Sequence, residues 1–132
     1  MTENAVEPHA GVVAIVDDDE AIRMAIGRLI RTIGYHSRTF PSAEGLLLEI
    51  ENFLPTCIIT DIQMPQMNGL DLVKELVKRG VKVPVMVMTA YPSLANRELA
   101  LLAGASEYLT KPLDIGRLEA WLSKVDSRHR PL

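Results

Sequence analysis

The sequence contains only one cysteine, Cys57, and no apolar run that approaches membrane length. A single cysteine excludes an intrachain disulfide. Because Cys57 lies in an apolar segment, we expect a buried core thiol rather than a reactive one. A membrane helix needs about 18 consecutive apolar residues, and the polar, acidic N-terminus is unlike a signal peptide. These absences favour a protein of the reducing cytoplasm.

A large excess of charge of either sign is also missing. The 132 residues carry 14 Lys+Arg and 17 Asp+Glu, a net charge of −3, which gives no general reason to expect nucleic-acid or membrane binding. The length is that of one domain, and 48% apolar residues suffice for a sizeable core. Residues 1–10 lack periodicity and are predicted to form a flexible tail. We expect the domain over residues 11–125 and a polar tail over residues 126–132.

Short apolar runs typical of strands alternate along the chain with apolar residues at helical spacing. The predicted strands cover residues 12–16, 35–40, 56–60, 83–88 and 107–110. Helical spacing follows each strand, over residues 22–33, 43–50, 72–77, 92–103 and 115–125. This alternation predicts an α/β fold with a five-stranded parallel sheet covered by helices on both faces. The second and fifth strands are the more polar, which predicts edge positions and the doubly wound, flavodoxin-like order 2-1-3-4-5.

Residues typical of helix ends mark several boundaries. Asp19 and Ser42 are suited to cap helix N-termini, and Gly34 is suited to end the first helix. Pro92 fits the first turn of the fourth helix. If Asp19 caps the first helix, the two aspartates before it remain for another role.

Polar side chains follow the predicted strands at the points where the strands end. In an open parallel α/β sheet, ligands bind beyond the carboxyl ends of the strands, where the strand order reverses. The predicted topology brings five such side chains to one crevice. They are Asp17 and Asp18 after the first strand, Asp61 after the third, Thr89 after the fourth and Lys111 after the fifth.

Three clustered carboxylates need a compensating charge, because two like charges at 4 Å repel by about 4 kcal/mol at an effective dielectric constant near 20. Oxygen ligands suit Mg²⁺, which takes one or two carboxylates, waters and phosphate oxygens, and no histidine or cysteine stands nearby to favour zinc. Lys111 offers a positive charge and Thr89 a hydroxyl for phosphate oxygens. A carboxylate nucleophile among these groups predicts phosphoryl transfer through an aspartyl phosphate.

Five short motifs surround these residues. They are Ile15-Val16-Asp17-Asp18-Asp19-Glu20, Thr60-Asp61-Ile62-Gln63-Met64-Pro65 with Gly69, Met88-Thr89-Ala90, Tyr108, and Lys111-Pro112. Each motif alone is unspecific, but their order at successive strand ends is specific. Together they resemble the receiver domain of two-component response regulators, over roughly residues 11–125.

The resemblance implies a catalytic and metal-binding role for the residues of the crevice. Asp61 is the expected phosphoacceptor, and Lys111 is expected to contact the phosphoryl oxygens and to precede Pro112 through a cis peptide bond. The resemblance also implies a bound Mg²⁺ with Asp61 among its ligands. Asp18 is the expected direct ligand and Asp17 one that acts mainly through water. The backbone carbonyl of Gln63 completes this set.

The resemblance also implies a switch rather than an enzyme with an external substrate. Thr89, the third expected catalytic residue, and Tyr108 resemble the pair that reorients on phosphorylation. The expected phosphoryl donor is a histidine kinase or a phosphotransfer protein, or a small acyl phosphate. Residues 92–125 are the expected face for a downstream protein or a second copy of the chain. Seven residues after the domain leave no room for an output domain, so the chain either acts alone by protein contact or belongs to a longer protein.

Two positions are expected to set the lifetime of the phosphorylated state. In receivers the hydrolytic water passes the residue two positions after the acceptor, here Gln63, and the residue two positions after the threonine, here Tyr91. The amide of Gln63 could orient a water. The ring of Tyr91 could exclude it, and we expect exclusion to prevail and to give a long-lived phospho-Asp61. The alternative is that Tyr91 points away from the site.

Three other functions are alternatives to a phosphorylated switch. A haloacid-dehalogenase-like phosphatase needs a second acid two residues after the nucleophile, where this chain has Gln63. A dinucleotide-binding domain needs a glycine-rich first turn, whereas this chain has three aspartates there. An interaction module that keeps the receiver fold without phosphate turnover is disfavoured because the expected catalytic residues are all present.

Overall fold

The computed structural model describes residues 11–126, and residues 1–10 and 127–132, which fall in the predicted tails, lie outside this range. Five strands form one parallel sheet in the order β2-β1-β3-β4-β5. The strands are β1 (Val12–Val16), β2 (His36–Phe40), β3 (Cys57–Asp61), β4 (Val85–Thr89) and β5 (Glu107–Thr110). The helices are α1 (Glu20–Ile33), α2 (Ala43–Glu49), α3 (Gly69–Lys78), α4 (Leu94–Ala103) and α5 (Ile115–Val125). The predicted doubly wound fold and strand order are therefore confirmed.

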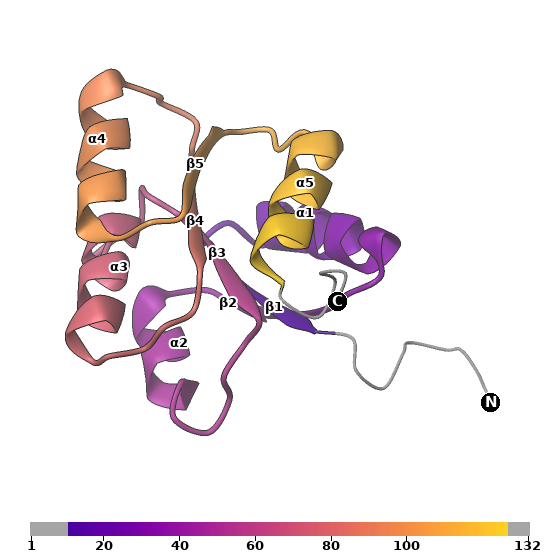
Figure 1. Ribbon diagram of the computed structural model, residues 1–132, viewed down its shortest axis with the longest axis horizontal. Helices are drawn as coiled ribbons and strands as arrows, with labels where there is room; N and C mark the ends of the chain where they lie inside the picture. The colour runs from indigo at the N-terminus through magenta and orange to yellow at the C-terminus, as the bar shows by residue number, and fades with distance from the viewer. Residues whose placement is uncertain (1–10, 127–132) are drawn as a thin grey trace.

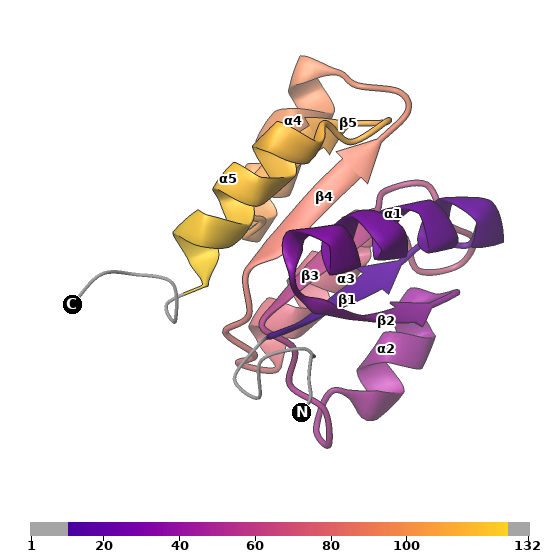
Figure 2. The ribbon, with the colours of Figure 1, turned by 90° about the vertical axis from the view of Figure 1, so that its right-hand side faces the viewer.

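Helices cover both faces of the sheet (Figure 1). α1 and α5 lie on one face, and α2, α3 and α4 on the other; in Figure 2, α1 and α5 lie in front of the strands. Side chains alternate along a strand, so Val13 and Ile15 join the apolar cluster under α1 and α5, whereas Ala14 and Val16 join the cluster on the other face. None of the helices in the described range is long and apolar enough to cross a membrane.

The exposure of the strands agrees with their positions in the sheet. Every residue of β3 and β4 is buried, whereas His36, Arg38 and Thr39 of β2 are exposed. Cys57 lies in the cluster under α1 and α5, as the sequence predicted for a core thiol, and Trp121 lies in the same cluster. The central, continuously apolar strands therefore carry the core, and the more polar strands form the edges.

Capping groups fix the first two helices where the sequence predicted. The Asp19 carboxylate accepts a hydrogen bond from the N–H of Ile22, and the Ser42 hydroxyl accepts one from the N–H of Gly45. Gly34 follows α1 with a φ of 109°, a conformation that residues with a side chain rarely adopt. The capping of α1 by Asp19 leaves the two preceding aspartates at the end of β1.

The fourth helix begins later than predicted. α4 starts at Leu94, and Ser93 caps it by accepting a hydrogen bond from the N–H of Asn96. Pro92 therefore precedes the cap instead of lying in the first turn. The hydroxyl of Ser93 satisfies an unpaired N–H of the helix, which the proline ring cannot do.

Two central strands end one residue later than predicted and so include the polar residues at their ends. Asp61 is the last residue of β3 and lies opposite Met88, and Thr89 is the last residue of β4 and lies opposite Thr110. β4 begins only after Pro84, which has no N–H to donate to a neighbouring strand. Both polar side chains therefore project from regular strand positions.

Two side chains are placed differently from the prediction. Val77, expected on the apolar face of α3, is 59% exposed. Asp126, expected in the polar tail, is buried and accepts a hydrogen bond from the Tyr35 hydroxyl at 2.8 Å. A sequence pattern that ends at the last turn of a helix cannot reveal a buried partner more than ninety positions earlier. The packed domain therefore reaches residue 126.

The start of α3 lies directly against the end of β3. A Cβ atom on Gly69 would lie 2.3 Å from the carbonyl oxygen of Asp61, far inside the sum of van der Waals radii. Asn68 caps the helix and exchanges hydrogen bonds with Asp71 in a capping box. Because position 69 has no side chain, α3 can begin beside the backbone that carries Asp61.

Candidate functional site

Three carboxylates meet at the carboxyl ends of β1 and β3. One oxygen atom each from Asp17, Asp18 and Asp61 lies within 4.8 Å of the other two. Asp17 is fully buried and Asp61 is 4% exposed, whereas Asp18 is exposed to solvent. The adjacency of β1 and β3 in the sheet produces this cluster. The structure thus brings together the three aspartates that were expected to converge.

The turn after β1 is held by hydrogen bonds to Asp17. Its carboxylate Oδ1 accepts a hydrogen bond from the N–H of Asp19 at 2.9 Å. Its carbonyl oxygen accepts one from the guanidinium of Arg23 in α1, at 2.7 Å. Arg23 was not identified from the sequence, because an arginine on a helix carries no signal that separates a structural contact from a solvated side chain.

Lys111 crosses from the end of β5 to the acidic cluster. Its Nζ lies 3.0 Å from Asp17 Oδ2 and 3.2 Å from Asp61 Oδ2. Burial alone would lower the pKa of Lys111, but the hydrogen bond and charge of Asp17, together with Asp61, outweigh burial and raise it. The ammonium is therefore held protonated between two carboxylates. The peptide bond between Lys111 and Pro112 is cis, as expected.

The pKa of Asp61 is raised from its ordinary value of 3.8. Burial is the main cause and the negative charge of Asp17 the second, while Lys111 and a hydrogen bond from the N–H of Gln63 act in the opposite direction. Lys111 therefore compensates only part of the negative charge. The carboxylate of Asp61 is more basic than that of an exposed aspartate, which favours nucleophilic attack, and a further cation would stabilise it.

The donor atoms of the cluster suit a small, hard cation. All three members are aspartates, so the ligands on offer are carboxylate oxygens, which Mg²⁺ prefers. The exposed Asp18 leaves one side of the cluster open to water, and Mg²⁺ retains water ligands. Asp17 has one oxygen bound to Lys111 and the other to a backbone N–H. Asp61 is engaged in the same way at longer distances, so Asp18 is the most accessible ligand of the three.

Thr89 is joined to both residues that were expected to control the lifetime of a phosphorylated state. Its hydroxyl donates a hydrogen bond to Gln63 Oε1 at 2.9 Å and accepts one from the N–H of Tyr91 at 3.0 Å. Thr89 is fully buried, whereas the side chain of Tyr91 is 72% exposed. The ring of Tyr91 is therefore not packed over the acidic cluster.

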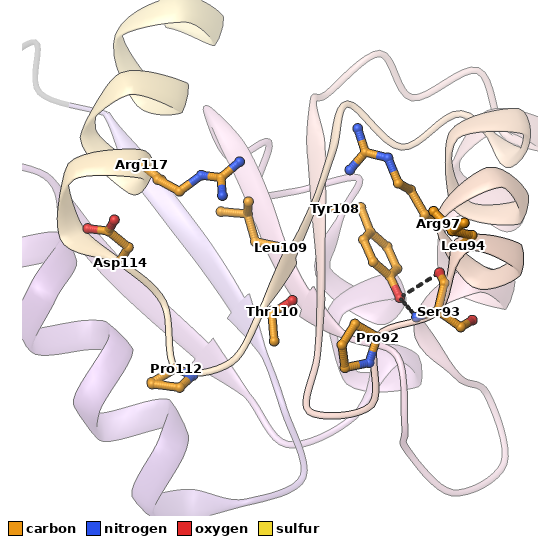
Figure 3. Close-up of a pocket in the computed structure, with 10 residues that line it drawn as sticks. All are labelled: Pro92, Ser93, Leu94, Arg97, Tyr108, Leu109, Thr110, Pro112, Asp114 and Arg117. Carbon is orange, nitrogen blue, oxygen red and sulfur yellow. Dashed lines mark hydrogen bonds between the residues drawn. The ribbon is translucent and has the colours of Figure 1, made fainter.

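Tyr108 lies on the far side of β4 from the acidic cluster and is buried. Its hydroxyl accepts a hydrogen bond from the N–H of Ser93 at 3.2 Å and donates one to the Ser93 carbonyl at 3.5 Å (Figure 3). Tyr108 is 5% exposed, so its ring packs inward against the domain. Beside it, a pocket of about 480 Å³ opens between α4, β5 and α5, and the guanidinium groups of Arg97 and Arg117 lie on its wall.

Comparison with known proteins places this geometry in a family. A model of the response regulator receiver domain matches residues 13–123. The DNA-binding transcriptional regulator NtrC of Salmonella typhimurium is 34% identical over 120 residues, which are 91% of this chain and 26% of NtrC. The response regulator protein TmoT of Ectopseudomonas mendocina is 35% identical over 101 residues, which are 76% of this chain and 46% of TmoT. The chain thus spans less than half the length of these relatives.

Solved structures of receiver domains share the fold. The receiver domain of the Francisella response regulator 1452 superposes with a TM-score of 0.83 at 28% identity, covering 91% of this chain and 99% of that one. A receiver domain protein from Clostridium thermocellum gives 0.81 at 31% identity, covering 89% and 95%. The family match spans both the acidic cluster and Lys111. The chain therefore belongs to the response regulator receiver domain family.

Proposed function

We propose that the protein is a phosphorylation-dependent switch whose acceptor is Asp61. The observation that carries this proposal is the position of the Asp61 carboxylate, within 3.2 Å of Lys111 Nζ and within 4.8 Å of oxygens from Asp17 and Asp18. A nucleophile beside a fixed ammonium and a potential metal site is the arrangement that phosphoryl transfer requires. The family match supports this reading over a phosphatase or a dinucleotide-binding domain.

In the proposed reaction, a carboxylate oxygen of Asp61 attacks the phosphorus of a phosphohistidine on a partner protein. The phosphorus–nitrogen bond breaks, and its electron pair leaves with the imidazole, which takes a proton. Lys111 is placed to stabilise the negative charge on the phosphoryl oxygens. A Mg²⁺ ion held by Asp18 and Asp61, with Asp17 through water and the Gln63 carbonyl, would neutralise further charge on these oxygens. The same residues would serve the hydrolysis that resets the switch.

The proposed output face comprises residues 92–125 and binds a downstream protein or a second copy of the chain. Its link to the acceptor is the segment after β4, because Thr89 bonds to the N–H of Tyr91 and Ser93 bonds to Tyr108. The pocket beside Tyr108 carries two arginines and offers a binding surface. Since NtrC is a DNA-binding regulator, an effect on transcription through a further domain or partner is one output of such a switch. We also infer a cytoplasmic location, which cell fractionation would check.

The first prediction concerns the acceptor. Asp61→Asn keeps the size and polarity of the side chain but removes the nucleophilic charge, so we expect no stable mass gain after incubation with acetyl phosphate and Mg²⁺. Intact-mass spectrometry measures this directly. Glu51→Gln, at an exposed position, is the matched control and should label like the wild type. An equal mass gain in Asp61→Asn would show that another residue is the acceptor.

The second prediction concerns the metal. Asp18→Ala removes an exposed carboxylate from the cluster, so labelling at fixed Mg²⁺ should slow by at least about tenfold, since even groups that only support metal ligands contribute that much. The control is Glu20→Ala, which removes an exposed acid outside the cluster and should label normally. Chelation of Mg²⁺ should stop labelling of the wild type. Normal labelling of the wild type in chelator would contradict a metal requirement.

The third prediction concerns the lifetime of the phosphorylated state. If the ring of Tyr91 moves over phospho-Asp61 and excludes water, Tyr91→Ala should lose phosphate severalfold faster than the wild type. Tyr91→Phe keeps the ring and should behave like the wild type. Decay of the labelled protein is followed by intact mass after removal of the donor. The side chain of Tyr91 is exposed in this structure. An unchanged rate of phosphate loss in Tyr91→Ala would mean that the ring stays in solvent and does not shield phospho-Asp61.

The fourth prediction concerns output. Phosphorylation should change amide hydrogen exchange most within residues 92–125, because Thr89 and Tyr108 contact the segment that begins α4. Mass spectrometry of peptides from the free and phosphorylated forms measures this change. Peptides of α2, on the opposite side of the domain from α5, are the internal control. A change confined to residues 20–55 would contradict the proposed output face.

A further inference from the structure

The hydroxyl proton of Thr89 is already used in this structure. A threonine hydroxyl donates one hydrogen bond, and here its donor contact is with Gln63 Oε1 at 2.9 Å. The oxygen also accepts the N–H of Tyr91, which fixes Thr89 from the other side. Thr89 is fully buried, so bulk water cannot replace a hydrogen-bond partner that its hydroxyl loses.

Gln63 is attached to the acceptor as well as to the threonine. Its backbone N–H lies 3.4 Å from Asp61 Oδ1, while its side chain reaches the hydroxyl of Thr89. The residue therefore bridges the ends of β3 and β4 above the acceptor. Its side chain is exposed, so water can solvate the amide once the bond to Thr89 is broken. The loss of this hydrogen bond therefore costs little free energy at the Gln63 amide.

We propose that Gln63 is a positioning residue that engages the Thr89 hydroxyl in competition with a phosphoryl group and so opposes the switch. The inference rests on the proposed phosphorylation of Asp61. For Thr89 to donate its single proton to a phosphoryl oxygen, it must first give up Gln63 Oε1. Gln63 Oε1 and a phosphoryl oxygen therefore compete for the single hydroxyl proton of Thr89. Each of the two hydrogen bonds belongs to a different state of the switch.

This role is distinct from orientation of a water molecule by the same amide. Orientation of a water would change only the rate of phosphate loss, whereas competition for the proton changes the equilibrium affinity of the site for a phosphoryl group. Because Gln63 is exposed, water replaces part of its bond to Thr89, and the net contribution of this hydrogen bond is small. Its removal should therefore shift the equilibrium about two- to fivefold towards the phosphoryl-bound state.

The test is the affinity for beryllium trifluoride, a phosphoryl analogue, measured by titration calorimetry at saturating Mg²⁺. Gln63→Met keeps the length of the side chain but removes the amide oxygen. We expect it to bind the analogue about two- to fivefold more tightly than the wild type. The same substitution in a Thr89→Ala background should then have no effect, because the competing donor is absent. Thermal unfolding of each variant controls for loss of the fold.

The outcomes separate this inference from the proposed function. Unchanged or weaker binding by Gln63→Met would overturn the competition. Tighter binding that persists in the Thr89→Ala background would also overturn it, since Gln63 would then act on the metal or the acceptor without Thr89. If the wild type fails to bind the analogue with Mg²⁺ present, the proposed function itself fails. Tighter binding that depends on Thr89 is the result that supports the role of Gln63.

Discussion

The site depends on the ammonium of Lys111 between two buried carboxylates. Asp17 and Asp61 stand at the ends of adjacent strands in the interior of an α/β sheet, where uncompensated charge is costly. Lys111 comes from the edge strand β5 and contacts both of them. It stabilises the cluster only in part, because Asp61 still holds a proton more strongly than an exposed aspartate. The remaining negative charge would attract a cation to the site.

The same strand ends connect this chemistry to the surface through a short chain of hydrogen bonds. Thr89 is bound to Gln63 on the acceptor side and to the backbone of Tyr91 on the other. Two residues further, Ser93 both caps α4 and binds the hydroxyl of Tyr108. A displacement of Thr89 therefore acts on the backbone that sets the start of α4. The geometry offers a physical route from charge at Asp61 to a change in a protein surface.

The sequence predicted most of the fold because the central strands and the helices carry clear periodicities. It also predicted which strand ends meet, since the more polar strands belong at the edges and the topology then follows. The sequence did not predict several individual side-chain contacts. The bond from Gln63 to Thr89, the support of Asp17 by Arg23 and the burial of Asp126 depend on rotamers and on partners distant in sequence. The later start of α4 shows that a capping hydroxyl decides a boundary that a proline only suggests.

The absence of a side chain at Gly69 has a consequence for how this loop can vary. Since any Cβ there would meet the carbonyl oxygen of Asp61 at 2.3 Å, no other residue fits without displacing β3 or α3. Residues 62–68 therefore form a loop whose flanking residues, Asp61 and Gly69, are in direct backbone contact. An insertion or deletion within this segment is compatible with the fold only if position 69 still packs against the carbonyl oxygen of Asp61.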